Sequence, residues 1–165
     1  MRVQQVMSLP AHTCHRRTRL SEVLLQMQDG DFGMMPVTDE HGRLVGIVTD
    51  RDIALALARH HRSPDDLTAA EIMHEQVYTV EQHHDVRDAM RIMARHQVRR
   101  LPVLDESRRV LGVLSIEDLL LDVRHRIRSG TEPTLLDVAE TLRAIVVPPH
   151  AMALQPQGGT RREHD

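Results

Sequence analysis

The chain has 165 residues, a formal net charge of −3 and 27% charged residues, and every one of its basic residues is an arginine. This length fits one compact domain or two small halves that share a core. The mildly negative charge lacks the basic footprint of a nucleic-acid-binding protein, and two aromatic residues, Phe32 and Tyr78, are too few for a reader of single strands.

The sequence also argues against export and membrane insertion. No continuous apolar run opens the chain, as a signal peptide requires, and none approaches the roughly 20 apolar residues of a membrane helix. A single cysteine, Cys14, excludes an intramolecular disulfide. We therefore expect a cytoplasmic protein that binds neither nucleic acid nor membrane.

The chain contains an internal repeat, in which residues 6–53 align with residues 72–119 at a constant offset of 66 and without a gap. Ten of the 48 aligned positions are identical, including a Pro-Val pair, an Asp-Glu pair and a glycine. Self-similarity at a fixed period marks each copy as one structural unit, and a unit of this size is marginal alone. We expect two copies that share an interface.

Each copy predicts the same order of elements: a strand, a helix, two strands and a second helix. The first helix of each copy carries apolar residues at i, i+3, i+4 and i+7, and turn-forming clusters join the two later strands. In the first copy we predict strands at 12–14, 34–37 and 44–49 and helices from Leu20 and at 51–60. In the second we predict strands at 77–80, 101–104 and 110–115 and helices from Val86 and at 117–126.

The remaining segments connect or follow the copies. Thr68 and Glu71 form a predicted capping box ahead of the second copy. From Thr134 the apolar spacing predicts an amphipathic helix that is stopped by Pro148-Pro149, and the polar composition beyond it predicts disorder. The expected division is a first copy at 3–62, a second copy at 68–128, a C-terminal helix at 134–147 and a disordered tail at 150–165.

Two octamers, GIVTDRDI from Gly46 and GVLSIEDL from Gly112, close the strand pairs. In each, a strand ends at a hydroxyl residue and a helix follows, so the hydroxyl of Thr49 or Ser115 lies at a helix N-terminus that favours an anion. The carboxylate three residues later, Asp52 or Asp118, can accept hydrogen bonds from both hydroxyls of a ribose. The alternative interpretation is a capping box, in which each pair caps its own helix.

This duplicated β-α-β-β-α pattern, with its Pro-Val strands and its G-h-h-[ST]-x-x-D octamers, resembles a tandem pair of CBS domains over residues 3–128. The resemblance implies an α/β (α+β) fold in which two repeats pack sheet to sheet as a pseudo-twofold pair and leave two clefts. It implies adenine-nucleotide binding in those clefts. One cleft would use Thr49 and Asp52 with the backbone around Val77 and Tyr78, and the other Ser115 and Asp118 with the backbone around Thr13 and Cys14.

The same resemblance places phosphate partners just before the Pro-Val strand, where this chain has Arg99 and Arg100. Their counterparts in the first copy, Gly33 and Met34, carry no charge. We therefore expect the two clefts to differ, with a phosphorylated ligand in the Thr49/Asp52 cleft. The arginines can equally be a solvated strand edge, and the departure in the first copy leaves room for a ligand with little phosphate, such as S-adenosylmethionine or adenosine.

Metal binding and catalysis find little support in the sequence. The adjacent pairs His60-His61 and His83-His84 cannot both face one ion, and no Cys or carboxylate stands at a typical zinc spacing. Nothing around Cys14 forms a nucleophilic triad, which favours an inert thiol, and no P-loop or GxGxxG is present. We expect no enzyme activity, no metal and no cofactor.

Two functional hypotheses follow. The first is a non-catalytic sensor that binds AMP, ADP, ATP or S-adenosylmethionine between the repeats and thereby favours one conformation. The second is a ligand-free dimerisation scaffold, with the helix from Thr134 docking on a protein partner. Standalone modules of the family that the chain resembles form homodimers, and we expect one here.

Overall fold

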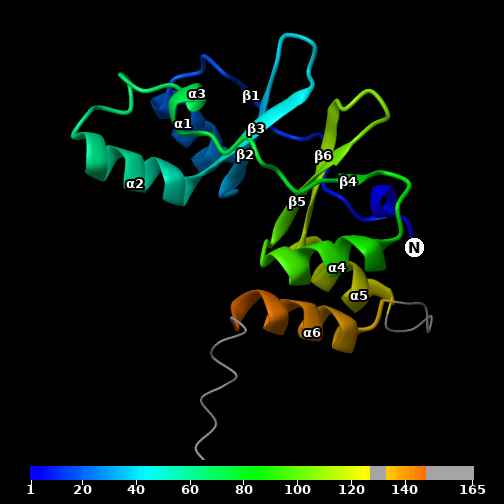
Figure 1. The fold of residues 1–165 in the computed structure, drawn as a ribbon. Coiled ribbons are helices and arrows are strands. Elements are labelled where there is room, and N and C mark those ends of the chain that lie inside the picture. Colours follow the sequence, from blue (N-terminus) through cyan, green and yellow to red (C-terminus); the bar gives the residue numbers. More distant parts are fainter. Residues whose placement is uncertain (127–132, 148–165) are drawn as a thin grey trace, which may run out of the picture.

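Two three-stranded sheets, one from each repeat, form the centre of the computed structural model, which describes residues 1–126 and 133–147 (Figure 1). The first repeat contains β1 (Cys14–His15), α1 (Leu20–Gly30), β2 (Met34–Thr38), β3 (Leu44–Thr49) and α2 (Asp50–His60). The second contains β4 (Val80–Glu81), α4 (Val86–His96), β5 (Arg100–Leu104), β6 (Val110–Ser115) and α5 (Ile116–Arg126). The 3-10 turn η1 (Val3–Gln5) lies ahead of β1, α3 (Ala69–Ile72) lies ahead of β4, and α6 (Leu135–Val146) follows α5.

The two sheets share one topology and one register. In each, the short first strand pairs parallel with the second, which pairs antiparallel with the third. Gly46 lies opposite Val37, and Gly112 lies opposite Val103 at the same place in the second sheet. The mixed α/β architecture of two β-α-β-β-α repeats and a C-terminal helix is therefore as predicted.

The strand prediction was wrong at the start of each repeat. The predicted strands 12–14 and 77–80 shrink to Cys14–His15 and Val80–Glu81. The reason is that the preceding residues run across to the other sheet: the amide of Ala11 donates to the carbonyl of Leu111 at 3.3 Å, and that of His74 donates to Ile47 at 2.9 Å. These segments serve the interface between the repeats before they join their own sheet.

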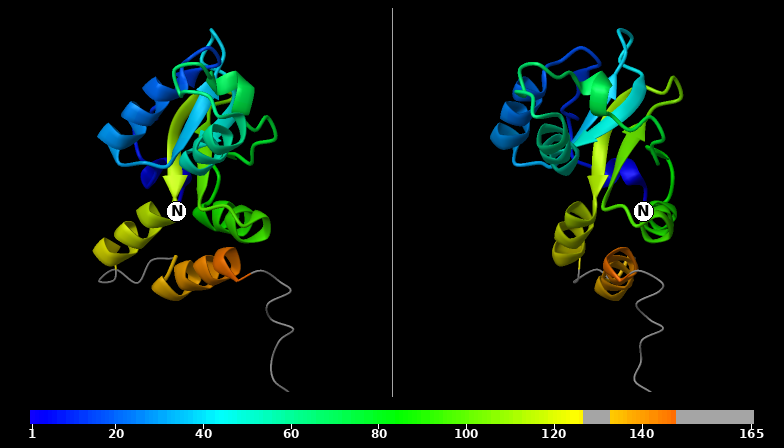
Figure 2. Two further views of the ribbon diagram at one scale, coloured as in Figure 1. Left: turned by 90° about the vertical axis from the view of Figure 1, so that its left-hand side faces the viewer. Right: turned by 60° about the vertical axis from the view of Figure 1, so that its left-hand side comes forward.

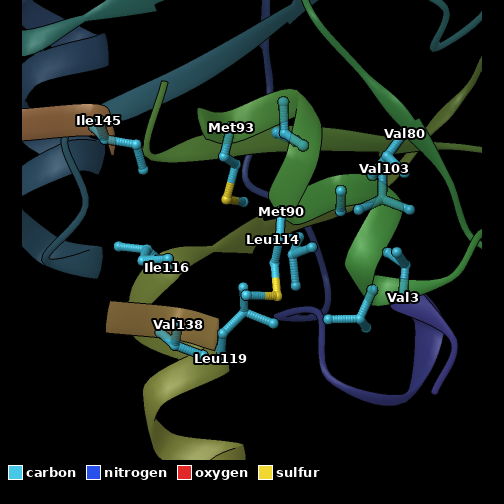
Figure 3. Close-up of a cluster of buried hydrophobic side chains, with 13 residues drawn as sticks. Val3, Val80, Met90, Met93, Val103, Leu114, Ile116, Leu119, Val138 and Ile145 are labelled. Atoms are coloured by element: carbon cyan, nitrogen blue, oxygen red, sulfur yellow. The ribbon is translucent and has the colours of Figure 1, made fainter. Parts of the chain in front are cut away.

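The segments that precede the repeats are exchanged between the two cores. Val3 is fully buried in the second repeat's core, and Figure 3 shows it in one cluster with Val80 and Val103. Leu67 is buried in the first repeat's core. Matching hydrogen bonds hold these segments, from Val86 N to Met1 O at 2.8 Å and from Leu20 N to Leu67 O at 3.0 Å. Each repeat is thus completed by residues that lead into the other.

The C-terminal helix α6 lies across α4 and α5 on the side away from the sheets (Figures 1 and 2). It buries Val138, Thr141 and Ile145, and Thr134 caps it by accepting the amide of Asp137 at 3.3 Å. The capping box predicted at Thr68 is also present, with Glu71 accepting the Thr68 amide at 2.8 Å. The predicted stop at Pro148-Pro149 and the tail at 150–165 lie outside the described residues.

None of the helices in the described part of the chain is long and apolar enough to cross a lipid bilayer.

Candidate functional site

Each candidate cleft forms where the segment that leads into one repeat crosses the last strand of the other sheet. Ser8 and Val113 exchange backbone hydrogen bonds of 2.9 and 3.2 Å, and His74 and Ile47 exchange bonds of 2.9 and 3.0 Å. Ser8 and His74 are counterparts at the repeat offset, as are Val113 and Ile47. The two clefts are therefore related by the internal symmetry of the chain.

The glycine that opens each octamer makes these crossings possible. A Cβ on Gly112 would lie 2.6 Å from the carbonyl oxygen of Ser8, and one on Gly46 would lie 3.0 Å from the carbonyl oxygen of His74. A side chain at either position would push the crossing segment away from the strand. The octamer glycine thus marks the place where the other repeat's segment passes.

The hydroxyl–carboxylate pairs form capping boxes at both helix N-termini. Oδ2 of Asp118 accepts hydrogen bonds from the amide and the hydroxyl of Ser115 at 2.7 and 2.6 Å. Oδ2 of Asp52 accepts the same two bonds from Thr49 at 3.0 and 2.5 Å. The capping interpretation is therefore realised in both repeats, but it occupies only one oxygen of each carboxylate.

The second carboxylate oxygen faces the segment that belongs to the other repeat. Oδ1 of Asp118 accepts the Ser8 hydroxyl at 2.8 Å, whereas Oδ1 of Asp52 lies 3.0 Å from Nε2 of His74. Burial opposes ionisation of Asp52, but the hydrogen bonds from Thr49 and His74 outweigh it and lower the pKa of the carboxyl. The two sites thus differ in the group that meets the carboxylate: a neutral hydroxyl in one and an imidazole in the other.

The Ser115/Asp118 cleft has a volume of about 490 Å³. One wall is the crossing segment, residues 8–12, and another comes from the end of α1 and the start of β2. The ring of His12 stacks on Phe32 at a centroid distance of 4.9 Å. The cleft is also lined by Asp31, Met34, Arg100, Val113 and Glu117.

The symmetry-related cleft has a volume of about 420 Å³, and the carboxylate of its octamer does not line it. Its lining includes Ile47, His74, Tyr78 and Arg100, but neither Thr49 nor Asp52. His74 lies between Asp52 and this space, because its backbone crosses at Ile47 and its ring contacts the carboxylate. Tyr78 is held against His96 at a centroid distance of 3.7 Å.

Comparison with known proteins identifies the fold family. A model of the CBS domain matches residues 3–59 and again residues 69–125. The chain belongs to the CBS domain family. Because both repeats match, it is a tandem CBS pair.

Relatives and solved structures agree with this assignment. The chain is 31% identical to YlbB of Bacillus subtilis over 140 residues, which cover 84% of this chain and 92% of YlbB. It is 29% identical over 99 residues to a Methanopyrus kandleri protein, covering 60% of this chain but only half of that protein. The CBS pair of protein MJ0100, solved with 5′-methylthioadenosine and S-adenosyl-L-methionine, superposes with a TM-score of 0.68 at 31% identity, over 76% of this chain and 98% of that chain.

The CBS pair brings together some of the predicted site residues and separates others. Ser115, Asp118 and Arg100 line the first cleft, and Tyr78 and Arg100 line the second. The others, which line neither cleft, are Thr49, Asp52, Val77, Arg99, Thr13 and Cys14. The backbone wall of the first cleft is residues 8–12, just before the predicted Thr13 and Cys14, because the crossing to the other sheet occurs earlier than the sequence indicated.

Arg99 and Arg100 separate in the CBS pair. Arg99 is exposed, and its carbonyl accepts the amide of Ile116 at 3.0 Å. Arg100, the first residue of β5, pairs with Ser115 at the end of β6, and this pairing brings its side chain between the clefts. Arg100 was expected to serve the Thr49/Asp52 cleft, but it lines both.

Several lining residues were not predicted from the sequence, notably Ser8, Phe32, His74 and Glu117. Two of them, Ser8 and His74, occupy equivalent positions in the repeat alignment. Because a serine and a histidine differ in chemistry, the alignment did not identify this position as part of the site. Within residues 1–126 and 133–147, no group of three His, Cys, Asp or Glu side chains is placed to hold a metal ion.

Proposed function

We propose that this CBS pair is a regulatory, non-catalytic module that binds an adenosyl ligand in the Ser115/Asp118 cleft. The observation that carries the proposal is the position of the Asp118 carboxylate, at a helix N-terminus and in the lining of a cleft of about 490 Å³ between the repeats. That volume lies within the range of small-molecule sites. The MJ0100 pair, a structural relative, binds S-adenosyl-L-methionine and 5′-methylthioadenosine.

The Asp118 carboxylate retains the capacity to hold a ribose. An ionised carboxylate has about four acceptor positions, and Asp118 uses two on Oδ2 for Ser115 and one on Oδ1 for Ser8. One ribose hydroxyl can therefore donate to Oδ1 directly. A second can replace the Ser8 hydroxyl, which is on an exposed residue and can turn to water at little cost.

The walls of the cleft suit a purine. Phe32, Met34 and Val113 supply apolar surface from both repeats, as sites for flat organic ligands commonly do. Because the ligand would contact both repeats, it binds more tightly to one relative arrangement of them than to another. Such differential affinity is what converts binding into a conformational signal.

The Thr49/Asp52 cleft is the weaker candidate for the same ligand. Its carboxylate is engaged by His74 and does not line the open space. A ribose would have to displace the imidazole before reaching Asp52. We therefore assign the first ligand per chain to the Ser115/Asp118 cleft.

The test is calorimetric titration of S-adenosylmethionine, 5′-methylthioadenosine, AMP, ADP and ATP into the wild-type chain and two matched variants. Asp118→Asn removes a charged acceptor whose hydrogen bonds contribute about 1.5–3 kcal/mol, so affinity falls by about tenfold or more. Asp52→Asn alters the equivalent capping box and leaves affinity within about twofold. Equal losses in both variants would reject the assignment to this cleft.

The dimerisation scaffold is the second candidate function, and the exposed helix pair of the first repeat favours it. Leu25 on α1 and Leu55 on α2 are 60% and 42% exposed, whereas α6 covers the equivalent pair α4 and α5. We propose a homodimer that buries α1 and α2, with the exposed Leu135 and Leu136 of α6 left for a protein partner.

Sedimentation velocity tests this scaffold. Leu55→Glu is expected to give monomers, because it places a charge in the proposed contact, and Leu136→Glu on α6 serves as the matched control that stays dimeric. If no adenosyl compound binds while Leu55→Glu dissociates the dimer, the scaffold replaces the sensor.

A further inference from the structure

We infer that the Ser115/Asp118 cleft selects an adenosyl ligand with a cationic or zwitterionic end over a polyphosphate, and that Glu117 sets this preference. The inference rests on the proposed function and specifies the ligand class of the same site. It follows from the charges that line the cleft, from the pairing of its arginine and from a difference between the two repeats.

The lining of the cleft is acidic. Three carboxylates, those of Asp31, Glu117 and Asp118, face one guanidinium, that of Arg100. A triphosphate would bring several negative charges into a space that already holds a formal charge of −2, with His12 neutral. Like charges at close range are unfavourable even when water screens them.

The single arginine is already paired. Nη2 of Arg100 lies 3.5 Å from Oε1 of Glu117, and the two side chains are 32% and 52% exposed. A phosphate could reach the guanidinium only by competing with Glu117 for it. A zwitterion matches the pair instead, because its carboxylate can bind Arg100 while its ammonium group binds Glu117.

The helix N-terminus offers a phosphate little in compensation. Free amides and the helix dipole normally favour an anion at such a terminus. In α5, however, the first turn carries the chain's own Glu117 and Asp118, and Asp118 already accepts the Ser115 amide. The chain's own carboxylates therefore offset the partial positive charge at the N-terminus of α5.

The first repeat shows the opposite charge at the matching position. Glu117 corresponds to Arg51 at the repeat offset, and the octamers read SIED in the second repeat and TDRD in the first. The carboxylates Asp118 and Asp52 are unchanged between them. The two repeats thus carry opposite charges at this one position, although Asp50, where the second repeat has Ile116, keeps the first turn of α2 net acidic.

The experiment measures affinities for S-adenosylmethionine, neutral 5′-methylthioadenosine and ATP by calorimetric titration of the full chain and its Glu117→Arg variant. The wild type is expected to prefer S-adenosylmethionine over ATP by about tenfold or more, the effect of one charge-assisted hydrogen bond. Glu117→Arg should weaken S-adenosylmethionine and tighten ATP by similar factors. The affinity for 5′-methylthioadenosine should change by less than about threefold, because it carries no charge to be selected.

Two further variants serve as controls. Glu106→Arg makes the same change in net charge at the exposed turn that precedes β6, at the opposite end of that strand, and should leave the preference unaltered. Glu117→Gln removes the charge without adding bulk and should give an intermediate preference. It tests the inference even if Glu117→Arg does not fold.

Each outcome bears on a separate part of the inference. If none of the three compounds binds the wild type, the proposed function fails and the inference fails with it. If ATP binds as tightly as S-adenosylmethionine or more tightly, the function stands and charge selection is overturned. A preference that persists in both Glu117 variants would assign selection to another residue.

Discussion

The thiol of Cys14 faces the core of the first repeat, where it is 5% exposed. Burial, assisted by the nearby Glu22 carboxylate, raises the pKa of the thiol from 9.0 to about 12. Since the thiolate is the reactive form, about one molecule in 10⁴ can react at pH 8, against about one in ten for the unfolded chain.

We therefore expect iodoacetamide to modify native Cys14 at least about 100-fold more slowly than the urea-unfolded chain. Mass spectrometry of timed samples at pH 8 measures both rates. Comparable rates would place the thiol at the surface and make it a candidate reactive group.

Asp52 provides a pH-dependent contribution to stability. Its folded-state pKa lies below the ordinary value of 3.8, because hydrogen bonds from Thr49 and His74 outweigh the effect of burial. A carboxylate with a lowered pKa stabilises the fold fully above the unfolded value, and this stabilisation is lost as the pH falls through the folded value.

Asp52→Asn is expected to lower the free energy of unfolding by about 1 kcal/mol at pH 7, the usual contribution of a helix cap. The difference from the wild type should shrink toward pH 2. Urea unfolding at both pH values measures it. A difference that stays constant would mean that the charge of Asp52 contributes nothing and that only its shape is needed.

Local spacing was sufficient to find the hydroxyl–carboxylate pairs, because Thr49 with Asp52 and Ser115 with Asp118 are three residues apart at a strand–helix junction. Spacing could not distinguish the two clefts. The distinguishing contacts come from Ser8, 110 residues away from Asp118, and from His74, 22 residues away from Asp52. These contacts depend on how the repeats cross. Neither a serine nor a histidine indicates from the sequence alone which distant carboxylate it will contact.

At the scale of elements, periodicity predicted the helices well because each has one buried face. It also predicted β3 and β6 at their observed bounds. The apolar spacing of α6 revealed a face to be buried but not the surface that buries it. That surface is the α4/α5 pair of the second repeat. The equivalent pair in the first repeat, α1 and α2, is not covered by α6, so this packing breaks the symmetry of the duplication.

Packing of α6 should contribute measurably to stability. Val138 is fully buried against α4 and α5, whereas Leu136 on the same helix is 67% exposed. Val138→Ala removes buried apolar groups and should lower the free energy of unfolding by about 2 kcal/mol.

Leu136→Ala is the matched control and should change that free energy by less than about 0.5 kcal/mol. Chemical denaturation followed by circular dichroism measures both variants. Equal effects of the two substitutions would mean that α6 is not docked through its Val138 face in solution.

At the scale of the whole molecule, the exchanged leading segments join the repeats into one cooperative unit. Neither core is complete without residues on the far side of the interface: Val3 fills the second and Leu67 fills the first. The N-terminal ammonium group adds an ion pair with Asp85 of the second repeat at 3.0 Å. Unfolding either repeat therefore exposes apolar surface belonging to the other.

Calorimetry should accordingly show a single transition whose measured and van't Hoff enthalpies agree. Val3→Ala removes about 1.5 kcal/mol of buried apolar contact and should lower the midpoint of the whole transition by about 5 °C. Although Val3 lies at the start of the first repeat in sequence, its loss acts first on the second repeat's core. Because each core contains a residue from the segment that leads into the other repeat, a loss of stability in one core must lower the unfolding temperature of both. Two resolved transitions, with only one of them shifted by Val3→Ala, would show instead that the repeats unfold independently.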